Sequence, residues 1–180
     1  MLLDILLPYY VQLDEDDVDV FHIYLLFLPN LRSINLTNVG FRFTILTKSF
    51  AMKCPRLEKM TWNRFNFYDS QISLNGEDME NFNHLQEIYM DDCVFESYSN
   101  NNNEQPLWDI SGNPNIFIFH KCSTSLERVS IKNARYVDNF LPQGPTRLPQ
   151  NALIKFILKA PPSLKWFRSD LWQENIDELQ

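Results

Sequence analysis

A short pattern of apolar residues recurs five times in this 180-residue chain and constrains its fold more than any other feature. A leucine is followed by apolar residues three and five positions later, as in Leu31-x-x-Ile34-x-Leu36, although the last unit has Ser169 at its final position. Strand side chains alternate with a period of two, so these two positions share one face of a short strand. The units begin at Leu31, Leu57, Leu85, Leu126 and Leu164. One unit cannot bury its apolar edge alone, and the pattern therefore predicts units stacked side by side.

The spacing between units locates two insertions. Successive leucines are separated by 26, 28, 41 and 38 residues. The first two intervals fall within the period of about 20–29 residues that is typical of short stacked repeats. The longer intervals contain an Asn-rich stretch near 97–112 and a Pro/Gly-containing stretch near 137–149, both with the composition of loops.

Turn-forming or polar residues stand directly before each leucine, and a helix candidate precedes each of these turns. The clearest candidate ends the array, where Leu153, Phe156, Ile157 and Ala160 fall on one helical face. The expected helices span Val18–Leu28, Thr44–Lys53, Glu77–Phe82, Asn115–Lys121 and Gln150–Lys159.

Three regions follow from this pattern. Residues 1–17 form an N-terminal segment, in which Met1–Tyr10 resembles the end of a preceding helix and an acidic run acts as a linker. Residues 18–172 form the array with its two insertions, and residues 173–180 form an acidic C-terminal tail. Uncapped ends of such an array expose apolar surface, so self-association is a further expectation.

These units resemble the leucine-rich repeat family in its ribonuclease-inhibitor-like and cysteine-containing styles, over roughly residues 18–172. Family members read LxxLxLxx(N/C)xL, and the position of the Asn or Cys is matched here only by Cys93. The resemblance implies an α/β solenoid with a short parallel concave sheet, convex helices and about five irregular repeats.

Alternation along the predicted strands also defines a face for a partner. If the apolar positions point inward, the residues between them point outward from the concave sheet. Aromatic and arginine side chains on such a surface are typical of protein interfaces. The candidate partner-binding residues are Lys59, Thr61, Glu87, Tyr89, Asp91, Arg128, Ser130, Trp166 and Arg168.

Two alternatives to this face remain open. Lys59, Glu87 and Arg128 fall on neighbouring strands, where they can neutralise one another as a solvated ladder of weak ion pairs. The segments 97–106 and 141–149 are alternative contact sites, because loops often carry function.

Charge and motif content narrow the function classes. The formal net charge of −7 argues against nucleic acid and anionic membranes as partners, since both require a basic surface. The sequence contains no phosphate-binding loop, nucleophile elbow or zinc-protease motif, so we expect no catalytic residues, metal or cofactor. Three widely spaced cysteines and the lack of a signal-peptide pattern favour a cytoplasmic or nuclear location.

The sequence therefore favours a non-enzymatic protein-protein interaction module. The alternative is the substrate-receptor portion of an F-box type ubiquitin ligase, because many F-box proteins carry arrays that resemble this one. The partner in either case is another protein.

The register makes a direct stability prediction for the middle unit. Leu85→Ala should lower the free energy of unfolding by about 2–5 kcal/mol, because it leaves a cavity between stacked units. A thermal or denaturant melt measures this loss, and an unchanged melt would contradict the assigned register.

Overall fold

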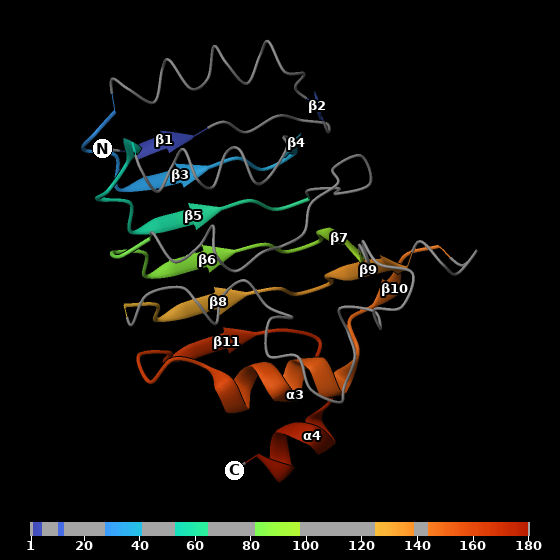
Figure 1. Ribbon diagram of the computed structural model, residues 1–180. Helices are drawn as coiled ribbons and strands as arrows, with labels where there is room; N and C mark the ends of the chain where they lie inside the picture. Colours follow the sequence, from blue (N-terminus) through green and yellow to red (C-terminus); the bar gives the residue numbers. More distant parts are fainter. Residues whose placement is uncertain are drawn as a thin grey trace, which may run out of the picture.

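Six short strands form one parallel sheet, in which neighbours in space are neighbours in chain order (Figure 1). The computed structural model describes residues 2–4, 11–12, 28–40, 53–64, 82–97, 125–138 and 144–179. The strands are β1 (Leu2–Asp4), β3 (Ser33–Asn35), β5 (Lys59–Thr61), β6 (Glu87–Tyr89), β8 (Arg128–Ser130) and β11 (Trp166–Arg168). The broad prediction of an α/β chain with a parallel sheet is confirmed.

The pairing register matches the alignment of the five leucine-led units. Ile34 pairs with Met60, Met60 with Ile88, Ile88 with Val129, and Val129 with Phe167. All five residues stand three positions after the leucine of their unit. The side chains of the first four are buried and Phe167 is half-buried, so this central column faces the interior.

The apolar core lies behind the sheet and follows the repeated positions. Leu31, Leu57, Leu85 and Leu126 are fully buried, whereas Leu164 at the end of the sheet is partly exposed. The position five after each leucine is also buried in the first four units, where it holds Leu36, Trp62, Met90 and Ile131. Each of these large side chains stabilises the fold by about 1.5–3 kcal/mol before conformational entropy is subtracted.

A left-handed residue ends the turn after four of the strands. Asn38, Arg64, Asp92 and Asn133 have φ values between 55° and 65°, and each stands seven positions after its leucine. The backbone N–H groups of the first three donate to a carbonyl of the following unit at 2.9–3.0 Å. Asn and Asp tolerate this conformation better than other non-glycine residues, which explains three of the four choices.

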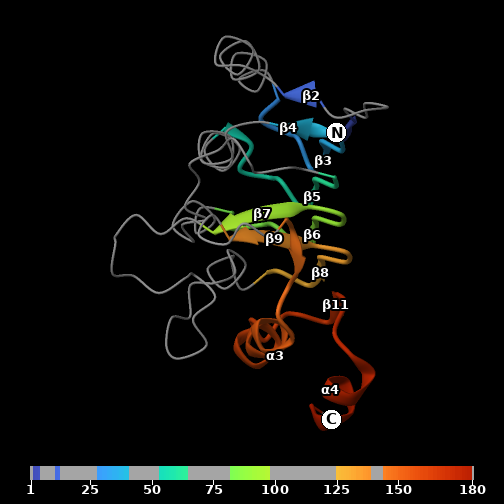
Figure 2. The ribbon, with the colours of Figure 1, turned by 90° about the vertical axis from the view of Figure 1, so that its right-hand side faces the viewer.

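A second, three-stranded sheet was not predicted. It contains β7 (Val94–Ser97), β9 (Arg135–Asp138) and β10 (Thr146–Arg147) in the order β10-β9-β7. This sheet lies beyond the turns of the main sheet (Figure 1), and Figure 2 shows β7 and β9 side by side from that side. The prediction of a plain loop for 137–149 is therefore wrong where β9 ends and β10 pairs with it. Aromatic and β-branched residues such as Tyr136 and Val137 favour strands once a pairing partner is present. A two-stranded pair, β2 (Val11–Gln12) with β4 (Val39–Gly40), completes the strands among the described residues.

Helix α3 (Gln150–Lys159) lies where the sequence predicts it, next to β11 at one end of the sheet (Figure 1). Ala152, Leu153 and Phe156 are buried, and the Phe156 and Phe167 rings lie 4.7 Å apart between centroids. The other four expected helices fall almost entirely outside the described residues. No helix in the described ranges is long and apolar enough to cross a membrane.

Both ends of the chain differ from expectation. Met1–Tyr10 was predicted as the end of a helix, but Leu2–Asp4 forms β1 and pairs in parallel with β3. An apolar run this short is compatible with either a helix or a strand, because it shows no clear periodicity. Pairing with the edge of β3 gives it the strand conformation. Within the expected acidic tail, Gln173–Glu178 forms the short helix α4.

Arg64 provides a test of the left-handed turn, because its exposed side chain is the least suited of the four to a positive φ. Arg64→Val should lower the free energy of unfolding by about 1 kcal/mol, whereas Arg64→Asn should leave it unchanged or raise it slightly. The same Arg→Val change at exposed Arg147, in strand β10, should cost nothing. Equal losses for both valine variants in chemical denaturation would contradict this account.

Candidate functional site

All nine candidate residues lie on or next to one face of the main sheet. Strands β5, β6, β8 and β11 contribute their first and third residues, which alternate with the buried central column. Asp91 lies in the turn that follows β6. We call this surface the polar face; it consists of Lys59, Thr61, Glu87, Tyr89, Asp91, Arg128, Ser130, Trp166 and Arg168.

Two aromatic rings meet at the centre of the polar face. The Tyr89 and Trp166 ring centroids are 6.2 Å apart, with an angle of 47° between the ring planes. Tyr89 belongs to β6 and Trp166 to β11, and β8 lies between these two strands. The rings therefore contact each other over β8.

This contact explains why one prediction was wrong. Ser130 on β8 was expected to be accessible to a partner, but it is completely buried. Its register neighbours are Tyr89 and Arg168, whose large side chains flank it, and the ring of Trp166 reaches across from β11. Ser130 therefore supports the face and is not available for direct contact.

Glu87 is the charged centre of the polar face. One carboxylate oxygen lies 3.4 Å from Lys59 Nζ, and the other lies 3.8 Å from Arg128 Nε. The Tyr89 hydroxyl donates a hydrogen bond to this carboxylate at 3.1 Å, and Lys59 Nζ lies 4.9 Å from the centre of the Tyr89 ring. Partial burial, followed by the hydrogen bond to Glu87, raises the pKa of Tyr89, so the phenol stays neutral. The charges thus form the neutralising ladder that was the alternative prediction for them.

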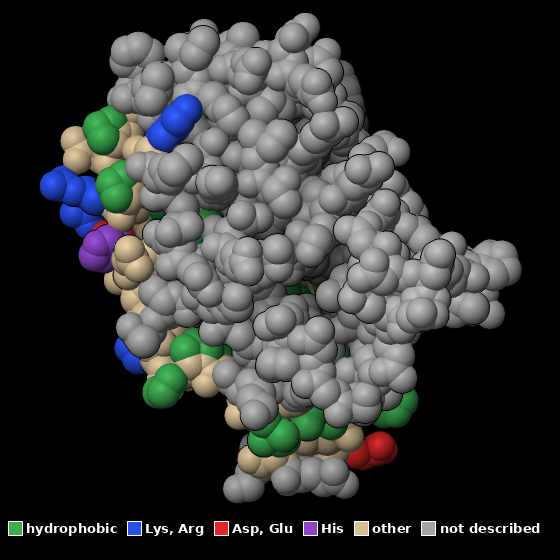
Figure 3. All heavy atoms as spheres, viewed as in Figure 1, with side chains coloured by type: hydrophobic (Ala, Val, Ile, Leu, Met, Phe, Trp, Pro, Cys, Tyr) green, Lys and Arg blue, Asp and Glu red, His purple; other side chains and the backbone are tan. Residues whose placement is uncertain are grey.

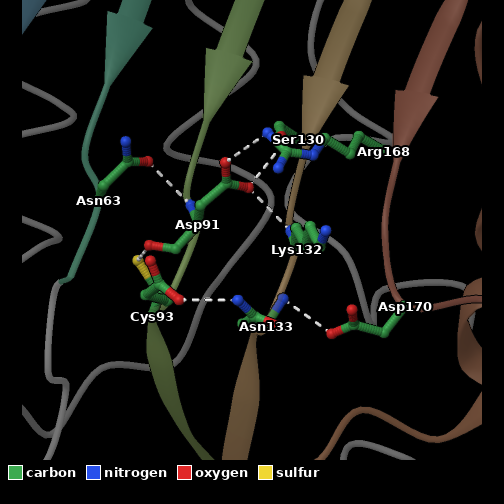
Figure 4. A network of polar contacts seen from close by, with 9 residues as sticks. Asn63, Asp91, Cys93, Ser130, Lys132, Asn133, Arg168 and Asp170 are labelled. Atoms are coloured by element: carbon green, nitrogen blue, oxygen red, sulfur yellow. Dashed lines mark hydrogen bonds and ion pairs between the residues drawn. The ribbon is translucent and has the colours of Figure 1, made fainter.

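Asp91 connects its own unit with three others (Figure 4). Its Oδ1 accepts hydrogen bonds from Ser130 Oγ at 2.5 Å and from the backbone N–H of Lys132 at 2.8 Å. Its Oδ2 lies 3.4 Å from Arg168 Nη1. The Asp91 backbone N–H in turn donates to Asn63 Oδ1 at 2.9 Å. With its carboxylate engaged in this way, Asp91 positions neighbouring residues of the face.

Sequence reasoning missed the support that side chains give to these turns. Asn63 and Asp91 occupy the same position, six after the leucine, and each accepts the backbone N–H of the residue at that position in the next unit. Asp170, also at this position, accepts the N–H of Asn133 at 2.7 Å. The recurrence of Asn or Asp at position six was the signal, because these side chains readily bond to backbone groups.

The two described thiols are structural. Cys93 is buried and donates a hydrogen bond from Sγ to the Trp62 carbonyl oxygen at 3.0 Å. This position is the one that matches the Asn/Cys of the leucine-rich repeat pattern. Cys54 is also buried, and burial raises its pKa to about 11 although nearby Lys53 opposes the shift. A nucleophile requires a thiolate at neutral pH, so Cys54 is not activated for such a reaction.

A hollow of about 480 Å³ lies at the end of the sheet, between β11, α3 and α4. Its walls are mostly apolar and include Ile157, Leu164, Phe167, Leu171 and Ile176. Hydrophobic side chains gather on the surface at this end of the molecule (Figure 3). Within the described ranges, no group of three or more His, Cys, Asp or Glu residues could hold a metal ion.

The Asp91 contacts make a quantitative prediction. Asp91→Ala should lower the free energy of unfolding by about 1–3 kcal/mol, because it leaves the buried Ser130 hydroxyl and the Lys132 N–H without their acceptor. Glu58→Ala is the control, since Glu58 forms an exposed ion pair with Arg32 and its loss should cost less than about 1 kcal/mol. Urea denaturation of both variants measures the difference, and losses of similar size would contradict the supporting role.

Comparison with known proteins leaves the family of the chain open. No protein-family model matches the sequence, and no curated protein is significantly similar to it. The geometry of the sheet and of its polar face is therefore the basis for assigning a function.

Proposed function

We propose that this chain is a non-enzymatic protein-protein interaction module of the leucine-rich repeat type, and that it binds its partner through the polar face. The proposal has two parts, a solenoid scaffold and a binding surface built on it. Each part has its own support in the contacts of the described residues.

The solenoid part is supported by hydrogen bonds that recur at four successive junctions. The carbonyl one residue after each leucine accepts two backbone N–H groups of the next unit, at 2.7–3.1 Å. These carbonyls belong to Arg32, Glu58, Gln86 and Glu127. The N–H five residues after each leucine donates to the next unit at 2.7–2.8 Å, again at all four junctions. Such equivalence is what one supersecondary unit, stacked repeatedly on its neighbour, would produce.

The observation that carries the binding part is the Tyr89–Trp166 contact on the polar face. Trp, Tyr and Arg are enriched among the residues that dominate interface energies. Here Arg128 pairs with Trp166 in the register of the sheet, and Arg168 stands two residues after Trp166 on β11. Trp166 keeps more than a third of its surface exposed. The ring contact and the ion pairs of the face already restrict these side chains, so binding would cost less conformational entropy.

An enzymatic role has no comparable support. The charged groups of the polar face are engaged with one another, and the buried thiol of Cys54 is protonated at neutral pH. The arrangement contains no nucleophile held by an activating base within the described ranges. A binding role therefore fits these contacts better than an enzymatic role.

The ubiquitin-ligase alternative would use the same face to hold a substrate. It makes one separate claim, which is that the full-length protein also binds the adaptor that recognises F-box domains. Co-purification of that adaptor would favour the alternative, and capture of other partners without it would favour a plain interaction module.

The proposed face predicts the outcome of affinity capture with the full chain as bait. Tyr89→Ala/Trp166→Ala should reduce recovery of the main specific partner at least tenfold, because hot-spot residues carry much of the binding energy. Trp172→Ala is the matched control, since Trp172 is an exposed tryptophan outside the polar face and should leave recovery unchanged. Circular dichroism should show folded protein in every case. Equal recovery with the double variant would exclude the polar face as the binding site.

A further inference from the structure

Resting on the interaction role proposed above, we infer that the partner of the polar face is an acidic, extended peptide segment. A partner that approaches the polar face meets its most exposed charges first. The charged side chains of this face differ in their exposure to solvent and in the hydrogen bonds and ion pairs that they form within the protein.

The cations of the polar face are more exposed than the carboxylates with which they pair. The side chains of Lys59, Arg128 and Arg168 are 44%, 53% and 49% exposed. Their partners Glu87 and Asp91 are only 30% and 17% exposed. An approaching molecule therefore meets positive charge, although the chain as a whole carries a formal net charge of −7. At physiological ionic strength, charges more than about 8 Å away are largely screened, so the local charges dominate.

The carboxylates of Glu87 and Asp91 accept hydrogen bonds from neighbouring groups of the protein, which fix their positions. Asp91 accepts from the Ser130 hydroxyl and the Lys132 backbone, and Glu87 accepts from the Tyr89 hydroxyl. The cations are held less tightly by their partners, because the N···O distances of their ion pairs are long, at 3.4–3.8 Å. Exposed pairs of this kind contribute little, so a carboxylate from a partner can approach the cations without a large loss.

The spacing of the cations indicates how such a peptide would lie. Lys59 on β5 and Arg128 on β8 share one register row and are separated by β6. Two inter-strand steps amount to about 10 Å, which is roughly the span of three residues in an extended chain. A peptide that crosses the strands with acidic residues three positions apart could therefore reach both cations. Tyr89 stands two residues after Glu87 on β6, between the strands of the two cations, and its ring would receive an aromatic residue placed between the two acids. Trp166 continues the row on the far side of Arg128.

The test uses synthetic peptides and the full chain at physiological salt. The probe is acetyl-GSEFGEGS-amide carrying a fluorophore, and its controls replace both glutamates by glutamine or by lysine. Fluorescence anisotropy should show that the glutamate peptide binds at least tenfold more tightly than either control. Tighter binding of the lysine peptide, or no binding of the glutamate peptide at 1 mM, would overturn the inference.

Variants of the protein test the role of each charge. Lys59→Gln/Arg128→Gln should weaken the glutamate peptide at least tenfold, whereas Arg147→Gln, an exposed cation on β10, should not change it. Glu87→Gln should strengthen binding several-fold, because it removes the carboxylate that competes for both cations. Unchanged or weaker binding of the glutamate peptide by Glu87→Gln would contradict the competing role assigned to this carboxylate.

Two further outcomes separate this inference from the proposed function. A single-stranded DNA oligonucleotide that binds as tightly as the glutamate peptide, and through the same cations, would overturn the assignment to an acidic peptide. A natural partner that lacks acidic segments but is lost with Tyr89→Ala/Trp166→Ala would overturn it too, while leaving the interaction role intact.

Discussion

The rest of this structure depends on the burial of one column of apolar side chains, to which successive strands of the main sheet contribute their central residues. Ile34, Met60, Ile88 and Val129 form that column, and each pairs with its counterpart in the next unit. A shift of one residue in any pairing would turn the buried side chains of that strand toward solvent. The hydrophobic effect therefore sets the register, and the register sets which polar side chains share the opposite face.

On that opposite face, polar contacts extend beyond immediate neighbours. The Tyr89 and Trp166 rings meet across an intervening strand, and the Asp91 carboxylate contacts both β8 and Arg168 on β11. The small side chain of Ser130 on β8 makes this possible, because a serine at this position leaves room for larger groups on either side. The face is thus held together by the sizes of its side chains as well as by their charges.

The sequence was sufficient to locate strands and helices where they depend on a local periodicity of apolar residues. The recurring leucines located five of the six strands of the main sheet, and the apolar face of Gln150–Lys159 located α3. The sequence did not reveal strands that form only by pairing with a strand from another part of the chain. Leu2–Asp4 becomes a strand only through β3, and Thr146–Arg147 only through β9. The burial of Ser130 likewise depends on the ring of Trp166, which reaches over β8 to the ring of Tyr89. The spacing of residues along the sequence does not reveal such a contact between side chains of distant strands.

The equivalent backbone bonding at the four junctions has a consequence for how such a chain can change. Leucines that begin neighbouring units are between 26 and 41 residues apart, yet the bonded strands are spaced alike. The entropy of closing a loop grows only with the logarithm of its length, so the longest connection costs only about 0.4 kcal/mol more than the shortest. Segments between strands can therefore lengthen and diversify at little thermodynamic cost. New contact surface could be acquired beside the sheet while the spacing of its side chains stays the same.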